Sequence, residues 1–334
     1  MKFEQELIQT KLFEQQLGDW PLAKENYALL GLVLHKQVDC GGMVVEVQFN
    51  PERVRSAIAN VCRPESEIKH GTTTCFLCPE NRPSEQVALS YSPEVFAGEC
   101  KSLLHSYDIL LNPYPIFPKH LTIPDKCHLP QLTEGRIGDF LSLAKDLSNF
   151  SLLYNGAHCG ASIPGHQHFQ AIERNVLPLE KESSKKRSLV SAKEAGAIYH
   201  FPGYLRKVFL LESDDRNWMH DTFNQIKKLL PVRDPQEKEP RFNLTIQYNE
   251  PLWQLYIFPR TNHRPAQFFE TDEKQLLTSP GVVDMSGVFV TVREADFNKL
   301  DKELLRDIYR QVTISDEEEL QIIRGLNTNK DETR

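Results

Sequence analysis

The stretch SLLYNGAHCGASIPGHQHFQAIER, residues 151–174, decides the fold class that the sequence predicts. It reads as a strand, a glycine-rich turn and a second strand, because apolar residues flank a run of Gly, Ser and Pro. In an extended strand, alternate side chains point to the same face. We therefore expect His166, His168 and Gln170 to lie in a row, with Phe169 on the opposite face.

Short strands in hairpins and single helices alternate along the rest of the chain. No regular βαβ alternation and no G-x-G-x-x-G after a strand is present, which disfavours a doubly wound sheet. The pattern predicts an α+β fold with antiparallel sheets and flanking helices. The expected elements are strands within 42–50, 106–124, 207–212 and 242–260, and helices over 1–20, 132–150 (with Thr133 as its cap), 215–230 and 299–312.

Bulk composition limits the class of protein. The length of 334 residues suggests about two domains. A formal net charge of −7 argues against a nucleic-acid-binding surface, and no apolar run reaches the roughly 18 residues of a membrane span. The amphipathic start is unlike a signal peptide, and the seven cysteines are an odd number. We expect a cytoplasmic protein with reduced thiols, acting without nucleic acid or membrane.

The residues of the 151–174 stretch suit phosphorus chemistry. A glycine-rich turn offers backbone N–H groups that hold phosphate oxygens. A neutral imidazole can attack phosphorus and form a covalent intermediate. Gln170 offers an N–H donor and a carbonyl acceptor, but it cannot carry a proton. The row therefore suits a nucleophile beside an amide that orients a phosphate.

The motif N-G…G-A-S-x-P…H-Q-H-F-Q, within 154–170, resembles the His-x-His-x-Gln signature of the nucleotidyltransferase branch of the histidine triad superfamily. That branch includes galactose-1-phosphate uridylyltransferases, diadenosine tetraphosphate phosphorylases and GDP-hexose phosphorylases. LLNPYPIFPKHLTIPDKCH (110–128) is similar to the hairpin that precedes the signature. The segments at 242–260 and 280–297 are similar to the C-terminal part of the phosphorylases. The resemblance implies two uridylyltransferase-like halves, the second one degenerate.

The resemblance assigns roles to individual residues. It implies that His168 is the nucleophile and that His166 is the first histidine of the signature. Gly165 departs from the family pattern, because it lengthens the turn by one residue and weakens the match of Ser162. The remaining positions match substrate-binding residues: Gln170, Gly160 and Ser162 at the phosphate, Asn155 at the substrate and Asn112 at the ribose.

Cys75 and Cys78 have the C-x-x-C spacing of half a zinc site, but two free buried cysteines have the same spacing. By resemblance to the uridylyltransferases, His128 and His166 would complete a structural Cys2His2 zinc site. His120 and Cys127 compete as ligands, because His120 lies on the same hairpin and Cys127 precedes His128.

Three arginines are further candidates. Arg53 and Arg55 are placed to neutralise nucleotide phosphates, or they belong to a solvated turn. Arg260 and His263 form a cationic cluster that either holds the second substrate or belongs to a surface loop.

We predict a nucleotidyltransferase that forms a covalent nucleotidyl-histidine and passes the nucleotidyl group to phosphate or a sugar phosphate. The donor is a GDP- or ADP-hexose or a dinucleoside polyphosphate. The alternatives are a hydrolase of the same superfamily and a catalytically idle nucleotide-binding protein. Polar residues 180–194 suggest a linker, so the predicted organisation is a catalytic domain (1–185), a degenerate domain (195–325) and a flexible tail (326–334), in a monomer or homodimer.

Overall fold

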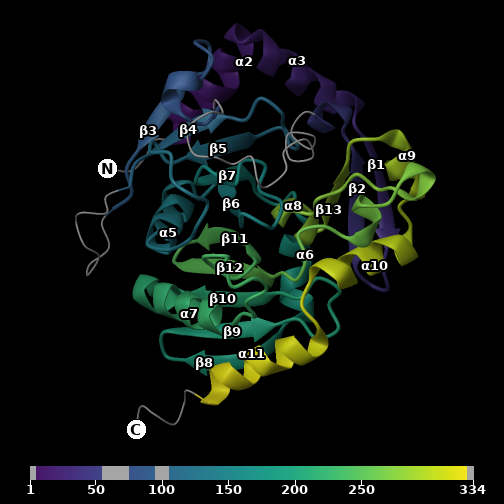
Figure 1. Ribbon diagram of the computed structural model, residues 1–334. Coiled ribbons are helices and arrows are strands. Elements are labelled where there is room, and N and C mark those ends of the chain that lie inside the picture. Colours follow the sequence, from purple (N-terminus) through teal and green to yellow (C-terminus); the bar gives the residue numbers. More distant parts are fainter. Residues whose placement is uncertain (1–4, 55–74, 95–104, 329–334) are drawn as a thin grey trace.

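The computed structural model describes residues 5–54, 75–94 and 105–328. Its centre is a ten-stranded sheet in the order β3-β4-β5-β7-β6-β11-β12-β10-β9-β8 (Figure 1), in which every pairing is antiparallel. The strands are β3 (Ala88–Tyr91), β4 (Tyr107–Leu111), β5 (His120–Pro124), β6 (Phe150–Asn155), β7 (His168–Glu173), β8 (Ser188–Lys193), β9 (Gly196–His200), β10 (Phe209–Ser213), β11 (Phe242–Asn249) and β12 (Leu252–Pro259). With its flanking helices, this sheet confirms the α+β prediction.

The sheet consists of two halves with the same topology. In the first half, β4, β5, the helix α5 (Ile137–Asp146), β6 and β7 follow one another and give the order β4-β5-β7-β6. In the second half, β9, β10, the helix α7 (Arg216–Leu229), β11 and β12 give the equivalent order β9-β10-β12-β11. The halves meet where β6 pairs with β11. β12, the counterpart of β7, contains no histidine, which fits a degenerate second half.

One face of the sheet packs against helices. Phe140 of α5 stacks on Phe169 of β7, with ring centroids 4.8 Å apart, and both side chains are buried. Helix α7 covers the same face of the second half (Figure 1), where Phe223 contacts Phe242 of β11 edge to face. The N-terminal helices extend this core through Ile8, Leu12 and Phe13. They are α1 (Gln5–Ile8), η1 (Gln9–Gln16), α2 (Leu17–Asp19) and α3 (Pro21–Leu29), followed by η2 (Leu30–Leu32).

The opposite face carries a small second sheet and the part of the C-terminal segment that ends at Val312. The last helix, Asp316–Thr328, returns to the first face, where Ile322 and Leu326 join the core around α7. The strands of the small sheet, β1 (Leu34–Asp39), β2 (Val44–Phe49) and β13 (Val288–Thr291), form the order β1-β2-β13. On this side, Ile172 of β7 packs with Leu153 and with Val282 of α8 (Val282–Met285). The predicted alternation is therefore confirmed for β7, since Phe169 and Ile172 lie on opposite faces. His166 precedes the strand, so the predicted row of three side chains is shortened to His168 and Gln170. The remaining helices are α6 (Pro178–Lys186), α9 (Glu294–Lys299), α10 (Lys302–Val312) and α11 (Asp316–Thr328), with short turns η3 (Pro51–Arg53), η5 (Pro79–Asn81), η7 (Ala266–Phe268) and η8 (Asp272–Lys274).

Three expectations are wrong. The polar stretch 180–194 is no linker, because it contains most of α6 and all of β8, the edge strand of the large sheet. Thr133 does not cap α5, which begins at Ile137. The Thr133 backbone N–H and hydroxyl instead donate to Glu239 at 3.0 and 2.8 Å. The first residues of the predicted tail belong to α11, and 329–334 lie outside the described residues.

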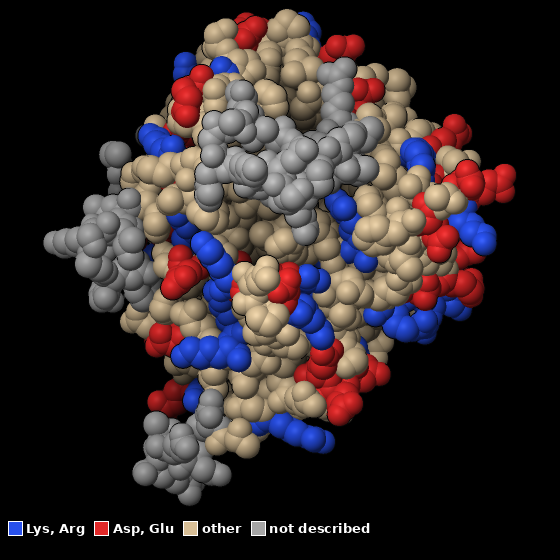
Figure 2. Space-filling model, in the orientation of Figure 1, with Lys and Arg blue, Asp and Glu red and all other residues tan. Residues whose placement is uncertain are grey.

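Charged side chains are spread over the molecule. Figure 2 shows acidic and basic side chains interspersed on the face seen in Figure 1. None of the helices in the described parts of the chain has the length and apolar character that a membrane crossing requires.

Candidate active site and metal centre

His168 begins strand β7 and presents one ring nitrogen as a free base. Its side chain is 3% exposed, and Nδ1 lies 2.8 Å from the His166 carbonyl oxygen. Because a carbonyl only accepts, Nδ1 carries the proton and Nε2 keeps its lone pair. No described residue forms a hydrogen bond with Nε2. Burial lowers the pKa of His168 to about 4, so the imidazole is neutral at pH 7.

Gln131 fixes the backbone of His168. Its Oε1 accepts the His168 N–H at 2.8 Å, and its Nε2 donates to the His168 carbonyl at 3.0 Å. The same Nε2 donates to the carbonyl of Asn155 at 2.9 Å. One buried side chain thus joins the start of β7 to the end of β6.

Gln170 is oriented by His120. His120 Nδ1 accepts the Ile116 N–H at 3.1 Å, so its proton is on Nε2, which donates to Gln170 Oε1 at 2.8 Å. Complete burial lowers the pKa of His120 to about 3 and keeps the ring neutral. The amide oxygen of Gln170 is therefore engaged, and its N–H donors have no partner among the described residues.

Asn155 is oriented in an analogous way from the second half. Its Oδ1 accepts from Asn243 Nδ2 at 2.8 Å and from the Val282 N–H at 2.7 Å. Asn243 Oδ1 accepts in turn from Arg260 Nη1 at 2.5 Å. The N–H donors of Asn155 have no partner within the described part of the chain.

These two amides line one cavity of about 110 Å³. The cavity is smaller than the roughly 300–1,000 Å³ of sites that enclose a whole drug-sized ligand, so it accommodates one group of a substrate. His168 lies two residues before Gln170 on the same face of β7. The cavity is lined by Arg53, Ile116, Asn155, Gly160, Ser162, Gln170, Phe268, Leu277, Thr278, Ser279, Gly281, Val282, Val283, Asp284, Val290 and Val292.

Gly160 is required by the shape of the turn at this cavity. Its φ is +89°, and a Cβ atom there would lie 2.6 Å from the Cα of Gly281.

Of the two arginines predicted near the phosphates, Arg53 lines the cavity. It donates to the Tyr114 carbonyl at 2.6 Å, and burial lowers its pKa to about 10, which leaves it cationic at pH 7. Arg55 lies outside the described residues.

Four ligating side chains converge beside the start of β7. The Cys75 and Cys78 Sγ atoms and the ligating nitrogens of His128 and His166 all lie within 4.8 Å of one another. Sγ to Nδ1 distances are 3.3 Å for Cys75–His166, 3.5 Å for Cys78–His166 and 3.2 Å for Cys78–His128. Tetrahedral zinc, with Zn–S of about 2.3 Å and Zn–N of about 2.0–2.1 Å, separates its S and N ligands by about 3.6 Å. The donor set and its spacing therefore fit a metal ion.

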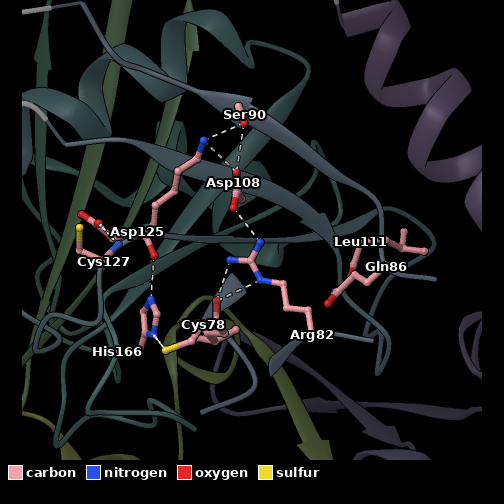
Figure 3. A network of polar contacts seen from close by, with 11 residues as sticks. Cys78, Arg82, Gln86, Ser90, Asp108, Leu111, Asp125, Cys127 and His166 are labelled. Carbon is pink, nitrogen blue, oxygen red and sulfur yellow. Dashed lines mark hydrogen bonds and ion pairs between the residues drawn. The ribbon is translucent and has the colours of Figure 1, made fainter. Parts of the chain in front are cut away.

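A further layer of contacts fixes this metal centre (Figure 3). His166 Nε2 lies 2.7 Å from the Asp125 carbonyl, so it donates there and leaves Nδ1 for the metal. Arg82 donates to the Leu77 carbonyl at 2.6 and 3.0 Å and to Asp108 at 2.7 Å, which ties the cysteine turn to β4. His120 and Cys127, the competing ligands, are not members of the cluster.

Two predicted substrate contacts have partners within the protein. Asn112 donates to Thr122 Oγ1 at 2.9 Å and accepts the Tyr114 N–H at 2.9 Å, within its own hairpin. All five N–H groups of Arg260 have protein acceptors: Val312 O, Asn243 Oδ1, Pro280 O, Asn262 O and His263 O. The roles of Asn112 and Arg260 in substrate binding stay predictions, and what the structure shows for Arg260 is support of Asn243.

Four residues of this site were not predicted as part of it. From the sequence, His120 was interpreted only as a competing metal ligand. Its place in the hairpin motif 110–128 was the signal that it lies near the site. Gln131, Asn243 and Asp284 carry no local signal, because their roles depend on contacts between segments far apart in the sequence.

Family comparisons cover both halves of the chain. Residues 12–173 match the model described as a domain of unknown function, DUF4922, and residues 178–324 match the one described as GDPGP1-like, C-terminal domain. The C-terminal half is thus similar to the C-terminal domain that this model describes. This match supports a relationship to the GDP-hexose phosphorylase family that the sequence motifs resemble.

The comparisons with solved structures and with curated proteins add little to the family matches. A DUF4931 family protein from Bacillus cereus ATCC 10987 aligns with 18% identity and a TM-score of 0.33, over 62% of this chain and 100% of that chain. No curated protein matches the chain.

Proposed function

We propose that the protein is a nucleotidyltransferase that cleaves a nucleotide-sugar, or a dinucleoside polyphosphate, with phosphate as acceptor. The GDPGP1-like half favours a GDP-hexose as donor. The catalytic residues are His168 as nucleophile and Gln170 as phosphoryl ligand, with His166 positioning the nucleophile through its carbonyl.

The reaction proceeds in two displacements. His168 Nε2 attacks the α-phosphorus, a P–N bond forms, and the hexose phosphate leaves with the electrons of the broken P–O bond. A phosphate oxygen then attacks the same phosphorus, and the electron pair of the P–N bond returns to Nε2. The product is a nucleoside diphosphate. Both steps depend on positioning and on stabilisation of phosphoryl charge.

The observation that carries the proposal is the fixed tautomer of His168. Its Nδ1–H is held by the His166 carbonyl at 2.8 Å, so the lone pair is on Nε2 before any substrate binds. The amide N–H groups of Gln170 and Asn155 are oriented by His120 and Asn243 toward the same cavity. Such preorganised donors stabilise charge on transferred phosphoryl oxygens.

For the metal centre we propose zinc, bound by Cys75, Cys78, His128 and His166. A closed Cys2His2 set has no open position for substrate, so the metal's contribution is structural. It fixes His166, whose carbonyl accepts the Nδ1–H of His168, and it takes no part in the two displacement steps.

The test is a screen of nucleotide-sugars and dinucleoside polyphosphates with labelled phosphate. We expect label in the nucleoside diphosphate and no turnover without an acceptor. His168→Gly should abolish turnover, and free imidazole should restore part of it by occupying the vacated position. His220→Ala, on the opposite helical layer, is the matched control and should retain activity.

Either of two outcomes would refute the proposed nucleotidyltransferase activity and point to another function. Equal rates with and without phosphate, with no label in the nucleotide, would identify a hydrolase. Nucleotide binding by calorimetry without any phosphorus exchange would identify a binding protein.

A further inference from the structure

The cavity beside Gln170 contains one carboxylate among hydrogen-bond donors. Asp284 is partly accessible, and its oxygens accept the N–H groups of Gly281 at 2.8 Å and Val290 at 3.0 Å. Within the described ranges, no basic side chain forms an ion pair with it. Each carboxylate oxygen therefore retains a lone pair for a ligand. The Gly281 contact forms the capping box of the short helix α8, and Asp284 also lines the cavity.

The other polar groups of the cavity suit an anion. Asn155 and Gln170 each have two amide N–H donors, so each has one for the transferred phosphoryl group and one for a second anion. Ser162 adds a hydroxyl, and Arg53 adds positive charge. An oxyanion whose oxygens are all acceptors, such as sulfate, would find these donors but would be repelled by Asp284. An oxyanion that keeps a proton at neutral pH, such as phosphate, can donate its O–H to the carboxylate and accept from the amides.

Asp284 is an acceptor at neutral pH. Burial raises its pKa to about 6, against the effect of the two backbone N–H groups and of Arg260, so the carboxylate is mostly ionised at pH 7. Other groups around it are Arg53 and Tyr309, whose hydroxyl donates to the Asp284 carbonyl at 2.8 Å. Since both oxygens already face backbone N–H donors, the site does not suit a cation.

We propose that this cavity selects a protonated tetrahedral oxyanion, inorganic hydrogen phosphate, by an O–H···O hydrogen bond to Asp284, and discriminates against sulfate. This inference rests on the proposed function, because it names the acceptor of the second displacement and the residue that recognises it. An unprotonated phosphate oxygen attacks the phosphorus bound to His168, and the P–N electron pair returns to Nε2. The remaining proton stays on the terminal phosphate of the product, facing Asp284.

The size of the cavity agrees with a single oxyanion. Its volume is about 110 Å³, below the roughly 300–1,000 Å³ of sites that enclose a whole drug-sized ligand. The apolar side chains of Ile116, Val282 and Val290 cover part of its wall.

The experiment measures oxyanion binding to the free enzyme, without nucleotide, by calorimetry and by thermal unfolding. Phosphate and arsenate keep a proton at neutral pH, whereas sulfate and selenate of similar shape do not. We expect the protonated pair to bind the wild-type protein at least about tenfold more tightly, the effect of one charge-assisted hydrogen bond. Equal affinities for the two pairs in the wild type would overturn the inference, without reference to any variant.

Asp284→Asn tests the assigned residue. The ratio of phosphate to sulfate affinity should fall toward one, because the amide can donate to sulfate. A role in folding alone would weaken both ions equally, and an unchanged ratio would overturn the inference. The control is Asp139→Asn, a buried carboxylate of α5 on the opposite face of the sheet, which should leave the ratio unchanged.

Oxyanion binding is measured without a nucleotide, whereas the proposed function is tested by turnover. One result can therefore contradict the phosphate selectivity or the proposed function without contradicting the other. Phosphate selectivity in a protein without turnover would support this inference and refute the proposed function. Turnover in a protein that binds phosphate and sulfate equally would do the reverse. A weaker affinity of Asp284→Asn for a hexose phosphate, with an unchanged phosphate-to-sulfate ratio, would assign Asp284 to a sugar hydroxyl and overturn the inference.

Discussion

The side chain of Gln131 holds the backbone of His168 on both sides of its Cα atom. Oε1 accepts the His168 N–H at 2.8 Å, and Nε2 donates to the His168 carbonyl at 3.0 Å. Gln131 comes from the segment that follows His128 of the Cys/His cluster, and its own N–H donates to the Pro164 carbonyl at 3.2 Å. The position of the proposed nucleophile is thus connected to the metal centre through one short segment.

Gln131→Leu should therefore lower kcat more than it alters KM. The leucine fills the space but leaves the His168 N–H without its partner, and a displacement of the imidazole by about 1 Å can cost about 100-fold in rate. The measurement is steady-state kinetics beside thermal unfolding. Gln16→Leu is the matched control, since Gln16 is also 1% exposed and donates to a backbone carbonyl, that of Glu85. A similar kcat loss in both variants would refute a positioning role.

Much of the local structure could be predicted because it depends on neighbours in the sequence. The alternation at His168, Phe169 and Gln170 indicated which face each side chain takes. The C-x-x-C spacing fitted half a metal site or two free cysteines, and the family resemblance pointed to its two histidines. The stretch 180–194 misled because it is polar, yet edge strand β8 needs few apolar side chains to pair with β9. Composition alone does not separate an exposed edge strand from a linker.

Metal removal should destabilise the protein. Structural zinc adds its binding free energy to folding, so Cys75→Ser and Cys78→Ser should lose the metal and lower the Tm. Elemental analysis of protein purified without chelator should give one zinc ion per wild-type chain. Cys127→Ser is the control, because this exposed cysteine precedes His128 but lies outside the cluster. Metal loss in Cys127→Ser alone would show that the ligand set is wrong.

Acid should destabilise the fold through two histidines, of which His120 is buried and His263 is half-buried. Burial, with nearby arginines, lowers the pKa values of both His120 and His263 to about 3, below the roughly 6.5 of an unfolded chain. Between these pH values the unfolded state binds a proton that the folded state does not, so stability falls as the pH drops through this window. From pH 7 to pH 5 we expect a loss of about 2 kcal/mol for each histidine.

Urea unfolding of wild type and His263→Asn at pH 8, 7 and 5 checks this expectation. At pH 8 neither state is protonated, so the difference between the proteins there reports packing alone. The variant should lose about 2 kcal/mol less than wild type between pH 7 and pH 5. Identical losses would show that the pKa of His263 is not lowered in the folded protein.

The connection between the two halves could not be predicted from the sequence. Asn155 ends β6 and Asn243 is the second residue of β11, and the two are register partners across the central strand pair. No local pattern marks Asn243, because its function depends on Asn155, which lies 88 positions away. The same holds for Gln131 and Asp284, whose contacts form only when the whole chain has folded.

Asn243→Leu should reduce kcat/KM by about tenfold, because Asn155 then loses the donor that orients its amide toward the cavity. Thr245→Val is the matched control on the same strand, since Thr245 is buried and its hydroxyl has no partner in the described structure. The decisive measurement is a double-mutant cycle with Asn155→Ala. If Asn243 acts only through Asn155, the double variant should be no slower than Asn155→Ala alone. Additive losses would mean that Asn243 and Arg260 influence the reaction by another route.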